Sequence, residues 1–287
     1  MVDFPQPMES DWEAHTLNRK RTANLAAKLL NRNLSGAGGE PIAIGGGGHH
    51  PRTNSSLLES PAMPTSNKIR FGIDGGAEVS ALFLAPAKPR WLLVLAHGAG
   101  AGMSHPFLES LSQELAAVNI ATFRYQFPYM EQRRRVPDRP PTLTATVVAA
   151  VRAAQEAAPG IPLLAGGKSM GGRMTSTAAS QQPLDRVRGL VFFGFPLHPP
   201  KQPGTKRAEH LRKVSVPMLF LQGARDTLAD LTLLRPIVAS LGPRATLHII
   251  DTADHSFHVL KSSGKTDAEI LRELAQTTLT WADKLET

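Results

Sequence analysis

The 287-residue chain contains no cysteine, which excludes disulfide bonds, a cysteine nucleophile and thiolate ligands to a metal. Aromatic residues make up only 6% of it, and no nucleic-acid-binding motif accompanies its basic charge, so we expect no nucleic-acid partner. No apolar run approaches the roughly 18 residues that would span a bilayer. Residues 1–13 also lack the basic and apolar segments of a secretory signal. These absences predict a cytoplasmic location and no membrane span.

The net charge of +8 is unevenly distributed along the chain. Residues 1–66 contain six Lys/Arg and six Asp/Glu, whereas residues 67–287 contain 26 and 18. The character of the sequence changes at the same boundary. Residues 11–32 have the apolar spacing of a short helix, and residues 35–66 have the Gly and Pro content of a flexible linker. We therefore predict an amino-terminal extension over 1–66 and one folded domain over 67–287.

Within the predicted domain, short apolar runs alternate with helical patterns. Residues 69–73 and 79–85 are separated by a turn signal and predict an antiparallel hairpin. Further runs have the continuous apolar character of strands buried on both faces: 91–96, 120–125, 162–168, 189–195, 217–222 and 245–250. Two segments have helical spacing of their apolar residues. One helical face contains Phe107, Leu111, Leu115 and Val118, and the other contains Ile270, Leu274, Trp281 and Leu285. The pattern predicts an α/β fold with a mostly parallel central sheet flanked by helices, and ligand sites at the carboxyl ends of its strands.

One such strand end carries the pentapeptide Gly167-Lys168-Ser169-Met170-Gly171, a G-x-S-x-G pattern. A serine becomes a useful nucleophile when a tight turn projects its hydroxyl toward a base, and such a turn needs small neighbours. A phosphate-binding loop would require a further glycine where the chain has Pro162. The pentapeptide therefore predicts Ser169 as a nucleophile on a strand-to-helix turn.

Three other strand ends supply the groups that a nucleophilic serine requires. The run 91–96 leads into a glycine-rich loop, and the backbone N–H groups of Ala99 and Met170 are the predicted oxyanion hole. The predicted acid, Asp226, follows the run 217–222, and the predicted base, His255, follows the run 245–250. The order Ser, Asp, His is the order that the α/β-hydrolase fold imposes.

Other residues compete for the roles of acid and base. Asp226 could instead cap the helix that begins near Thr227, and Asp230 is a weaker rival for the role of the acid. His258 and His198 are rivals to His255, and solvated or structural roles suit them better.

Basic residues surround the predicted nucleophile: Arg124, Lys168 and Arg173. They either pair with Asp or Glu at the sheet edge or recognise an anionic ester or thioester. The connection from Gly194 to Val216 is too short for a large helical lid, so we expect an open pocket.

Four blocks of the sequence resemble a particular family within the α/β hydrolases. The blocks are His97–Met103, Phe123–Tyr129, Gly167–Arg173 and Phe195–Pro200. The family groups bacterial proteins labelled dienelactone-hydrolase-like with a testis-expressed animal protein and a regulatory subunit of the animal non-specific-lethal chromatin complex. The resemblance implies a serine hydrolase fold for about residues 68–285. Since true dienelactone hydrolases use a cysteine nucleophile, it indicates kinship rather than their activity.

The expected function is hydrolysis of a carboxylic ester or thioester, a small acyl substrate, by Ser169, Asp226 and His255. Water completes such a cycle, so no cofactor or metal is expected. Because the animal members serve in assemblies, the alternative is a non-catalytic α/β-hydrolase-fold protein with an interaction or regulatory role. A peptidase ranks last, because the chain has no propeller or lid to restrict access.

Overall fold

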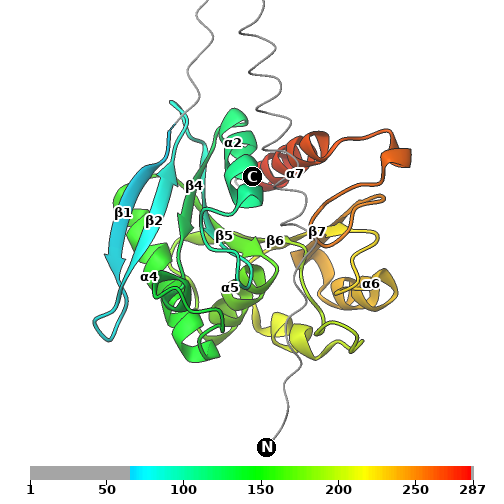
Figure 1. Cartoon of the computed structure of the whole chain (residues 1–287), viewed down its shortest axis with the longest axis horizontal. Coiled ribbons are helices and arrows are strands. Elements are labelled where there is room, and N and C mark those ends of the chain that lie inside the picture. Colours follow the sequence, from blue (N-terminus) through cyan, green and yellow to red (C-terminus); the bar gives the residue numbers. More distant parts are fainter. Residues whose placement is uncertain (1–64, 286–287) are drawn as a thin grey trace, which may run out of the picture. The chain divides into compact units, whose positions relative to one another are not determined.

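The computed structural model describes residues 65–285 (Figure 1). The helix predicted over 11–32 and nearly all of the predicted extension lie outside the described residues. The division of the chain at residue 66 therefore stays a prediction.

Eight strands form one sheet in the order β1-β2-β4-β3-β5-β6-β7-β8. Their bounds are β1 Asn67–Gly72, β2 Glu78–Leu84, β3 Trp91–Ala96, β4 Ile120–Tyr125, β5 Leu163–Lys168, β6 Val187–Phe193, β7 Met218–Gly223 and β8 Ala245–Ile250. The strand β2 runs antiparallel to both β1 and β4, and every other neighbouring pair is parallel. The predicted hairpin and the mostly parallel sheet are confirmed.

The clearest difference from the predicted strands concerns β6, which was expected over 189–195 and ends at Phe193. Gly194 has a φ of 71°, and its N–H donates to the carbonyl oxygen of Leu221 at 2.8 Å. The apolar run continues to Phe195 because that side chain is buried in the core although its backbone has left the strand. The apolar residue at 195 therefore indicated a buried side chain rather than a strand. The glycine with positive φ at 194 is where the strand ends.

Helices cover both faces of the sheet (Figure 1). The helices α2 (Pro106–Ala117) and α7 (Asp267–Asp283) contribute to one hydrophobic core, and α4 (Pro140–Ala157), α5 (Met170–Gln181) and α6 (Leu231–Ser240) contribute to the other. The remaining helical segments are α3 Pro128–Glu131, η1 Lys206–Lys213, η2 Gly242–Arg244 and η3 Lys261–Ser263. In such a three-layer arrangement, ligands bind outside the carboxyl ends of the strands.

The two helical faces predicted from apolar spacing agree with the structure to different degrees. In α7, which begins with a capping box between Thr266 and Glu269, the predicted side chains of Ile270, Leu274 and Trp281 are buried. In α2 the core position near the start belongs to Leu108 rather than to the predicted Phe107. Phe107 is only half-buried because its ring stacks on a loop residue near the site rather than on the sheet.

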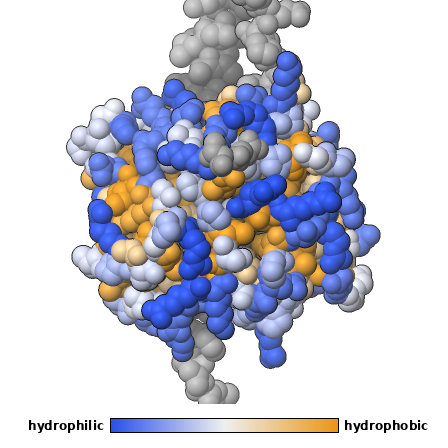
Figure 2. All heavy atoms as spheres, turned by 180° about the vertical axis from the view of Figure 1, so that it is seen from behind, coloured by the Kyte–Doolittle hydropathy of each residue, from blue (hydrophilic) through white to orange (hydrophobic). Residues whose placement is uncertain are grey.

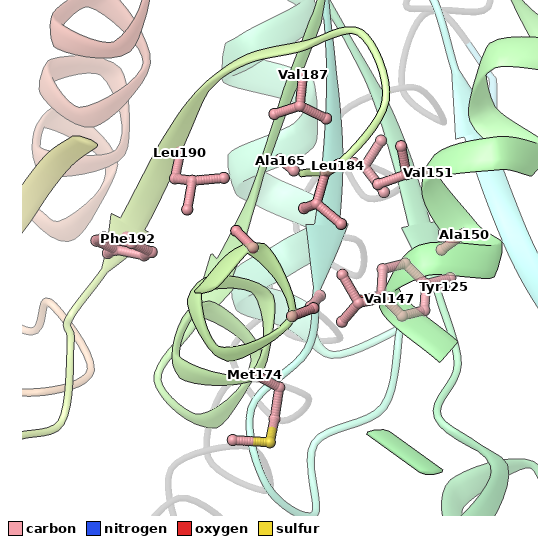
Figure 3. Packing of buried hydrophobic residues seen from close by; sticks show 14 of the residues in the cluster. Tyr125, Val147, Ala150, Val151, Ala165, Met174, Leu184, Val187, Leu190 and Phe192 are labelled. Atoms are coloured by element: carbon pink, nitrogen blue, oxygen red, sulfur yellow. The ribbon is translucent and has the colours of Figure 1, made fainter. Parts of the chain in front are cut away.

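Side chains of α4 and α5 meet those of β4, β5 and β6 in the larger core (Figure 3). On the face shown in Figure 2, hydrophobic surface appears between hydrophilic side chains. Among the described residues, the large hydrophobic side chains that remain well exposed are Val136 and Leu260. The apolar residues of this part of the chain are thus mostly used within the two cores.

Between β6 and β7, residues 194–217 form only the short helix η1, so this connection carries no large lid. Over residues 65–285, no helix combines the length and the apolar character that crossing a bilayer requires.

Candidate active site

Ser169 lies on the sharp turn between β5 and α5, with φ of 51° and ψ of −115°. Glycines make that turn possible. A Cβ atom on Gly167 would lie 2.4 Å from the carbonyl oxygen of Ala96, and one on Gly171 would lie 2.5 Å from the same oxygen. Since real Cβ contacts are never this short, only glycine lets the turn approach β3 so closely. The predicted strand-to-helix turn is therefore present, with its serine in a left-handed conformation.

The three side chains predicted as nucleophile, base and acid lie in one hydrogen-bonded line. His255 Nε2 is 2.9 Å from Ser169 Oγ, and His255 Nδ1 is 2.7 Å from Asp226 Oδ2. Asp226 lies just after β7 and His255 follows β8, so each group comes from the carboxyl end of its own strand.

Asp226 is buried and has several hydrogen-bond donors. Its Oδ1 accepts from the N–H of Leu228 at 2.8 Å, and its Oδ2 accepts from the side-chain amide of Gln222 as well as from His255. Burial by itself raises the pKa of Asp226, but the hydrogen bond and the charge of His255, with smaller contributions from Leu228 and Lys168, lower that pKa overall. The carboxylate therefore stays ionised near neutral pH and can only accept hydrogen bonds.

An ionised Asp226 determines which tautomer of His255 fits the site. The imidazole must donate its Nδ1–H to the carboxylate, which leaves Nε2 to accept from the Ser169 hydroxyl. Burial lowers the pKa of His255 and the nearby charge of Lys168 lowers it further, while Asp226 only partly offsets the two. The ring is therefore neutral, and able to act as a base, at and somewhat below neutral pH.

The predicted oxyanion donors lie on both sides of Ser169. Met170 is the first residue of α5, so its N–H has no acceptor within the helix. The loop that holds Ala99 lies beside the nucleophile, since a Cβ on Gly98 would be 3.8 Å from the Cβ of Ser169. Within residues 65–285, no hydrogen bond to another chain group uses the N–H of Ala99 or Met170.

The loop from His97 is anchored by the segment that follows β4. Tyr129 Oη accepts from the N–H of Gly100 at 3.0 Å, and His97 Nε2 accepts from the N–H of Phe127 at 3.1 Å. Burial is the main cause that lowers the pKa of His97 to about 4, so this ring is a neutral acceptor. The two blocks 97–103 and 123–129, singled out in the sequence, are therefore joined by hydrogen bonds, and the second holds the loop that contains the predicted oxyanion donor Ala99.

The rival residues have other partners. Asp230 caps α6, where its Oδ1 accepts from the N–H of Thr232 at 2.7 Å. His258 Nδ1 is 3.0 Å from Asp267, and its side chain is 66% exposed. His198 Nδ1 lies 2.8 Å from the carbonyl oxygen of Pro199.

Of the basic residues near the predicted nucleophile, Arg124 is fully buried near the carboxyl end of the internal strand β4. Its guanidinium donates to the carbonyl oxygen of Met103 at 3.3 Å and to Ser66 Oγ at 3.1 Å, and it pairs with Glu109 at 3.5 Å. These contacts favour a paired charge that ties β4 to α2, which was the alternative to a substrate contact.

Lys168 lies directly before the predicted nucleophile Ser169 and is bonded to the loop that contains His255. Its Nζ donates to the carbonyl oxygen of His255 at 2.6 Å and lies 5.9 and 5.6 Å from the ring centroids of Phe107 and Phe257. Burial lowers the pKa of Lys168 to about 8, against the opposing charges of Asp226 and Asp254. These contacts favour a positioning role for Lys168.

Arg173 lies one helical turn after the nucleophile, where its N–H donates to the carbonyl oxygen of Ser169 at 3.1 Å. Its Nε is buried and has no hydrogen-bond partner in the part of the chain that the structure describes. Arg124 Nε is also unpartnered, but Arg124 and Lys168 make other side-chain hydrogen bonds, whereas the side chain of Arg173 makes none within residues 65–285.

A family model described as alpha/beta hydrolase domain matches residues 89–283, well over half of the chain. The chain belongs to the alpha/beta hydrolase domain family. The narrower resemblance, to the family with animal members, stays a prediction.

Solved structures of other alpha/beta hydrolases share the fold at low sequence identity. A dienelactone hydrolase from Anabaena variabilis is 19% identical with a TM-score of 0.62, over 76% of this chain and 97% of that one. A serine hydrolase without a lid from Xanthomonas campestris is 16% identical with a TM-score of 0.61, over 76% and 95%. A serine hydrolase homologue from Coxiella burnetii is 17% identical with a TM-score of 0.60, over 75% and 98%. These likenesses show the fold.

Sequence reasoning missed one supporting residue of this alpha/beta hydrolase, Gln222. Its Oε1 accepts from the buried N–H of Phe195 at 3.0 Å while its amide donates to Asp226. A polar residue near the end of a fully buried apolar strand was the available signal, because a buried amide needs partners.

No group of three or more His, Asp or Glu side chains in residues 65–285 is arranged to hold a metal ion. The His49-His50 pair lies outside the described residues. That the protein needs neither metal nor cofactor stays a prediction.

Proposed function

We propose that the protein is a serine hydrolase that cleaves a small carboxylic ester or thioester with Ser169, His255 and Asp226. The observation that carries the proposal is the line of hydrogen bonds from Ser169 Oγ to His255 Nε2 at 2.9 Å and from His255 Nδ1 to Asp226 at 2.7 Å. The left-handed turn at Ser169 and the unused N–H groups of Met170 and Ala99 support it.

In the proposed acylation step, Ser169 Oγ attacks the acyl carbonyl carbon while its proton passes to His255 Nε2. The carbonyl oxygen becomes an oxyanion that the N–H groups of Met170 and Ala99 stabilise. When the tetrahedral intermediate collapses, the bond to the leaving oxygen or sulfur breaks, and His255 returns its proton to that atom. Asp226 keeps the ring oriented and stabilises the imidazolium between the two proton transfers.

Deacylation repeats the same steps with water as the nucleophile. His255 takes a proton from the water as the water oxygen attacks the acyl carbon of the acyl-enzyme. When the second tetrahedral intermediate collapses, the bond from the acyl carbon to Ser169 Oγ breaks, and His255 returns the proton to Oγ. The products are a carboxylic acid and the alcohol or thiol.

The test is labelling of the purified protein with a fluorophosphonate probe, together with hydrolysis of 4-nitrophenyl valerate and of a short acyl thioester. We expect wild type to be labelled and active, and Ser169→Ala to lose the label and at least about 10³-fold in kcat/KM. Ser180→Ala, a serine of the same helix whose hydroxyl bonds the carbonyl oxygen of Thr177, is the matched control. A wild type that is neither labelled nor active would contradict the proposal and favour the non-catalytic alternative.

A further inference from the structure

We propose that Arg173 and Arg207 form a subsite for a carboxylate that the substrate carries in addition to its ester or thioester. The inference rests on the proposed function and names the substrate class of that site: acyl compounds with a second, anionic group.

The position of Arg173 follows from the turn that presents the nucleophile. Ser169 is the N-cap of α5. The backbone N–H of Arg173 donates to the carbonyl oxygen of Ser169, so the two residues are one helical turn apart. Side chains on a helix lean toward its amino terminus, so a residue one turn along covers the turn before it. The guanidinium thus extends from the part of α5 that is nearest to the reacting groups.

The helix η1 brings the second arginine to the same face of α5. His210 Nε2 lies 2.8 Å from Ser176 Oγ, which attaches η1 to α5 less than one turn beyond Arg173. On the same short helix, Arg207 donates from Nη1 to the carbonyl oxygen of His198 at 2.9 Å. That hydrogen bond uses one edge of the guanidinium and leaves its other donors for a ligand.

The two arginines lack the anionic partner that their surroundings call for. Within residues 65–285, neither makes an ion pair with an Asp or Glu, whereas buried Arg124 pairs with Glu109. In this part of the chain the buried Nε atoms of both Arg124 and Arg173 lack a hydrogen-bond partner, but only Arg173 also lacks an ion pair. Partial burial of two guanidinium groups without a counter-charge is unfavourable in free energy, and a bound anion would offset this penalty.

The titration of neighbouring groups agrees with close positive charges. Burial lowers the pKa of Arg173 and the charge of Arg207 lowers it further. Burial and then the charge of Arg173 lower the pKa of His210 to about 4, so that ring adds no charge near neutral pH. Both directions are those that two neighbouring guanidinium charges would produce.

A carboxylate suits this pair better than a neutral group does. The planar guanidinium donates two parallel hydrogen bonds to the two oxygens of a carboxylate, and such charge-assisted bonds are stronger than neutral ones. With the ester carbonyl at Ser169 and the carboxylate at the arginines, half-esters of dicarboxylic acids and esters of carboxylated alcohols are the compounds that match.

The test compares kcat/KM within two matched pairs of esters. One pair differs in the acyl part, mono-4-nitrophenyl glutarate against 4-nitrophenyl valerate, and the other in the leaving group, 4-acetoxybenzoate against phenyl acetate. For at least one of the two pairs, we expect Arg173→Gln and Arg207→Gln each to lower the ratio of kcat/KM for the anionic ester to kcat/KM for the neutral ester by about 10-fold. Loss of one charge-assisted hydrogen bond predicts a change of this size. Arg173→Lys, which keeps the charge but not the planar fork, should lower it less. Arg212→Gln, an exposed arginine of the same helix, should leave both ratios unchanged.

The outcomes separate this inference from the proposed function. If wild type hydrolyses the neutral esters in a Ser169-dependent way and the arginine variants leave both ratios within twofold, the subsite is wrong and the hydrolase stands. If wild type hydrolyses no ester, the proposed function fails, and calorimetric titration with glutarate still tests the subsite. Binding of glutarate to Ser169→Ala that weakens about 10-fold when Arg173→Gln is added supports the subsite. Binding unchanged by Arg173→Gln, or no binding at all, overturns it.

Discussion

The Lys168 ammonium donates a hydrogen bond to the carbonyl oxygen of His255 at 2.6 Å, so the residue before the proposed nucleophile holds the backbone of the proposed base. The rings of Phe107 and Phe257, stacked with centroids 5.8 Å apart, lie 5.9 and 5.6 Å from the ammonium. One cation thus connects the end of β5, the start of α2 and the loop after β8, and its charge acts on the imidazole that it positions.

Replacing Lys168 should change the pH dependence of the reaction. The charge of Lys168 lowers the pKa of His255, so Lys168→Met should raise that pKa and move the acid limb of kcat/KM to higher pH. Loss of the hydrogen bond should also lower kcat at the optimum, by about 10-fold. The measurement is the pH profile of ester hydrolysis, and Lys261→Met, an exposed lysine of η3, is the control. An acid limb that stays in place in Lys168→Met would contradict the role given to its charge.

Gln222 should matter to both activity and stability, because it connects Asp226 to the backbone of Phe195. In Gln222→Met, a side chain of similar size leaves the buried N–H of Phe195 without an acceptor and removes one donor to Asp226. We expect the free energy of unfolding to fall by about 1–3 kcal/mol and kcat to fall by about 10-fold. Urea unfolding and steady-state kinetics measure the two effects, with exposed Gln276→Met as the control. Equal unfolding midpoints for Gln222→Met and wild type would show that the bridge contributes nothing.

Gly171→Ala should destabilise the fold through the close approach of the turn to β3. The added Cβ would meet the carbonyl oxygen of Ala96 at 2.5 Å, and backbone on both sides cannot move as a flexible side chain would. We expect a loss of about 1–3 kcal/mol in the free energy of unfolding, the usual cost of overpacking. Thermal or urea denaturation measures it. Gly72→Ala, at an exposed position with no atom within 4 Å of the new Cβ, should be neutral, and a similar loss in both variants would argue against the clash.

The strands and the line of candidate catalytic residues could be predicted from the sequence because each is encoded locally. Strands buried on both faces are continuous apolar runs, and the residues just past their ends share one edge of the sheet. Ser169, Asp226 and His255 each follow such a run, and the structure brings them within hydrogen-bond distance.

The partners of the charged side chains could not be predicted in the same way. Lys168 lies beside Phe107 and Phe257, and η1, which carries Arg207, contacts α5, only because segments far apart in the sequence pack together. Arg124 stood in the sequence as an equal of Arg173, yet one faces Glu109 and the other faces no carboxylate in the described residues. Such differences depend on tertiary packing, which apolar periodicity does not report.

The connection from β6 to β7 supplies none of the proposed reacting groups, although its helix η1 contacts α5, the helix that Ser169 caps. If Arg207 binds the substrate carboxylate as proposed, exchange of this segment would change substrate preference and leave Ser169, His255 and Asp226 in place. For protein engineering, η1 is the segment to randomise in a search for altered substrate preference, with β5, β7 and β8 kept as a constant frame.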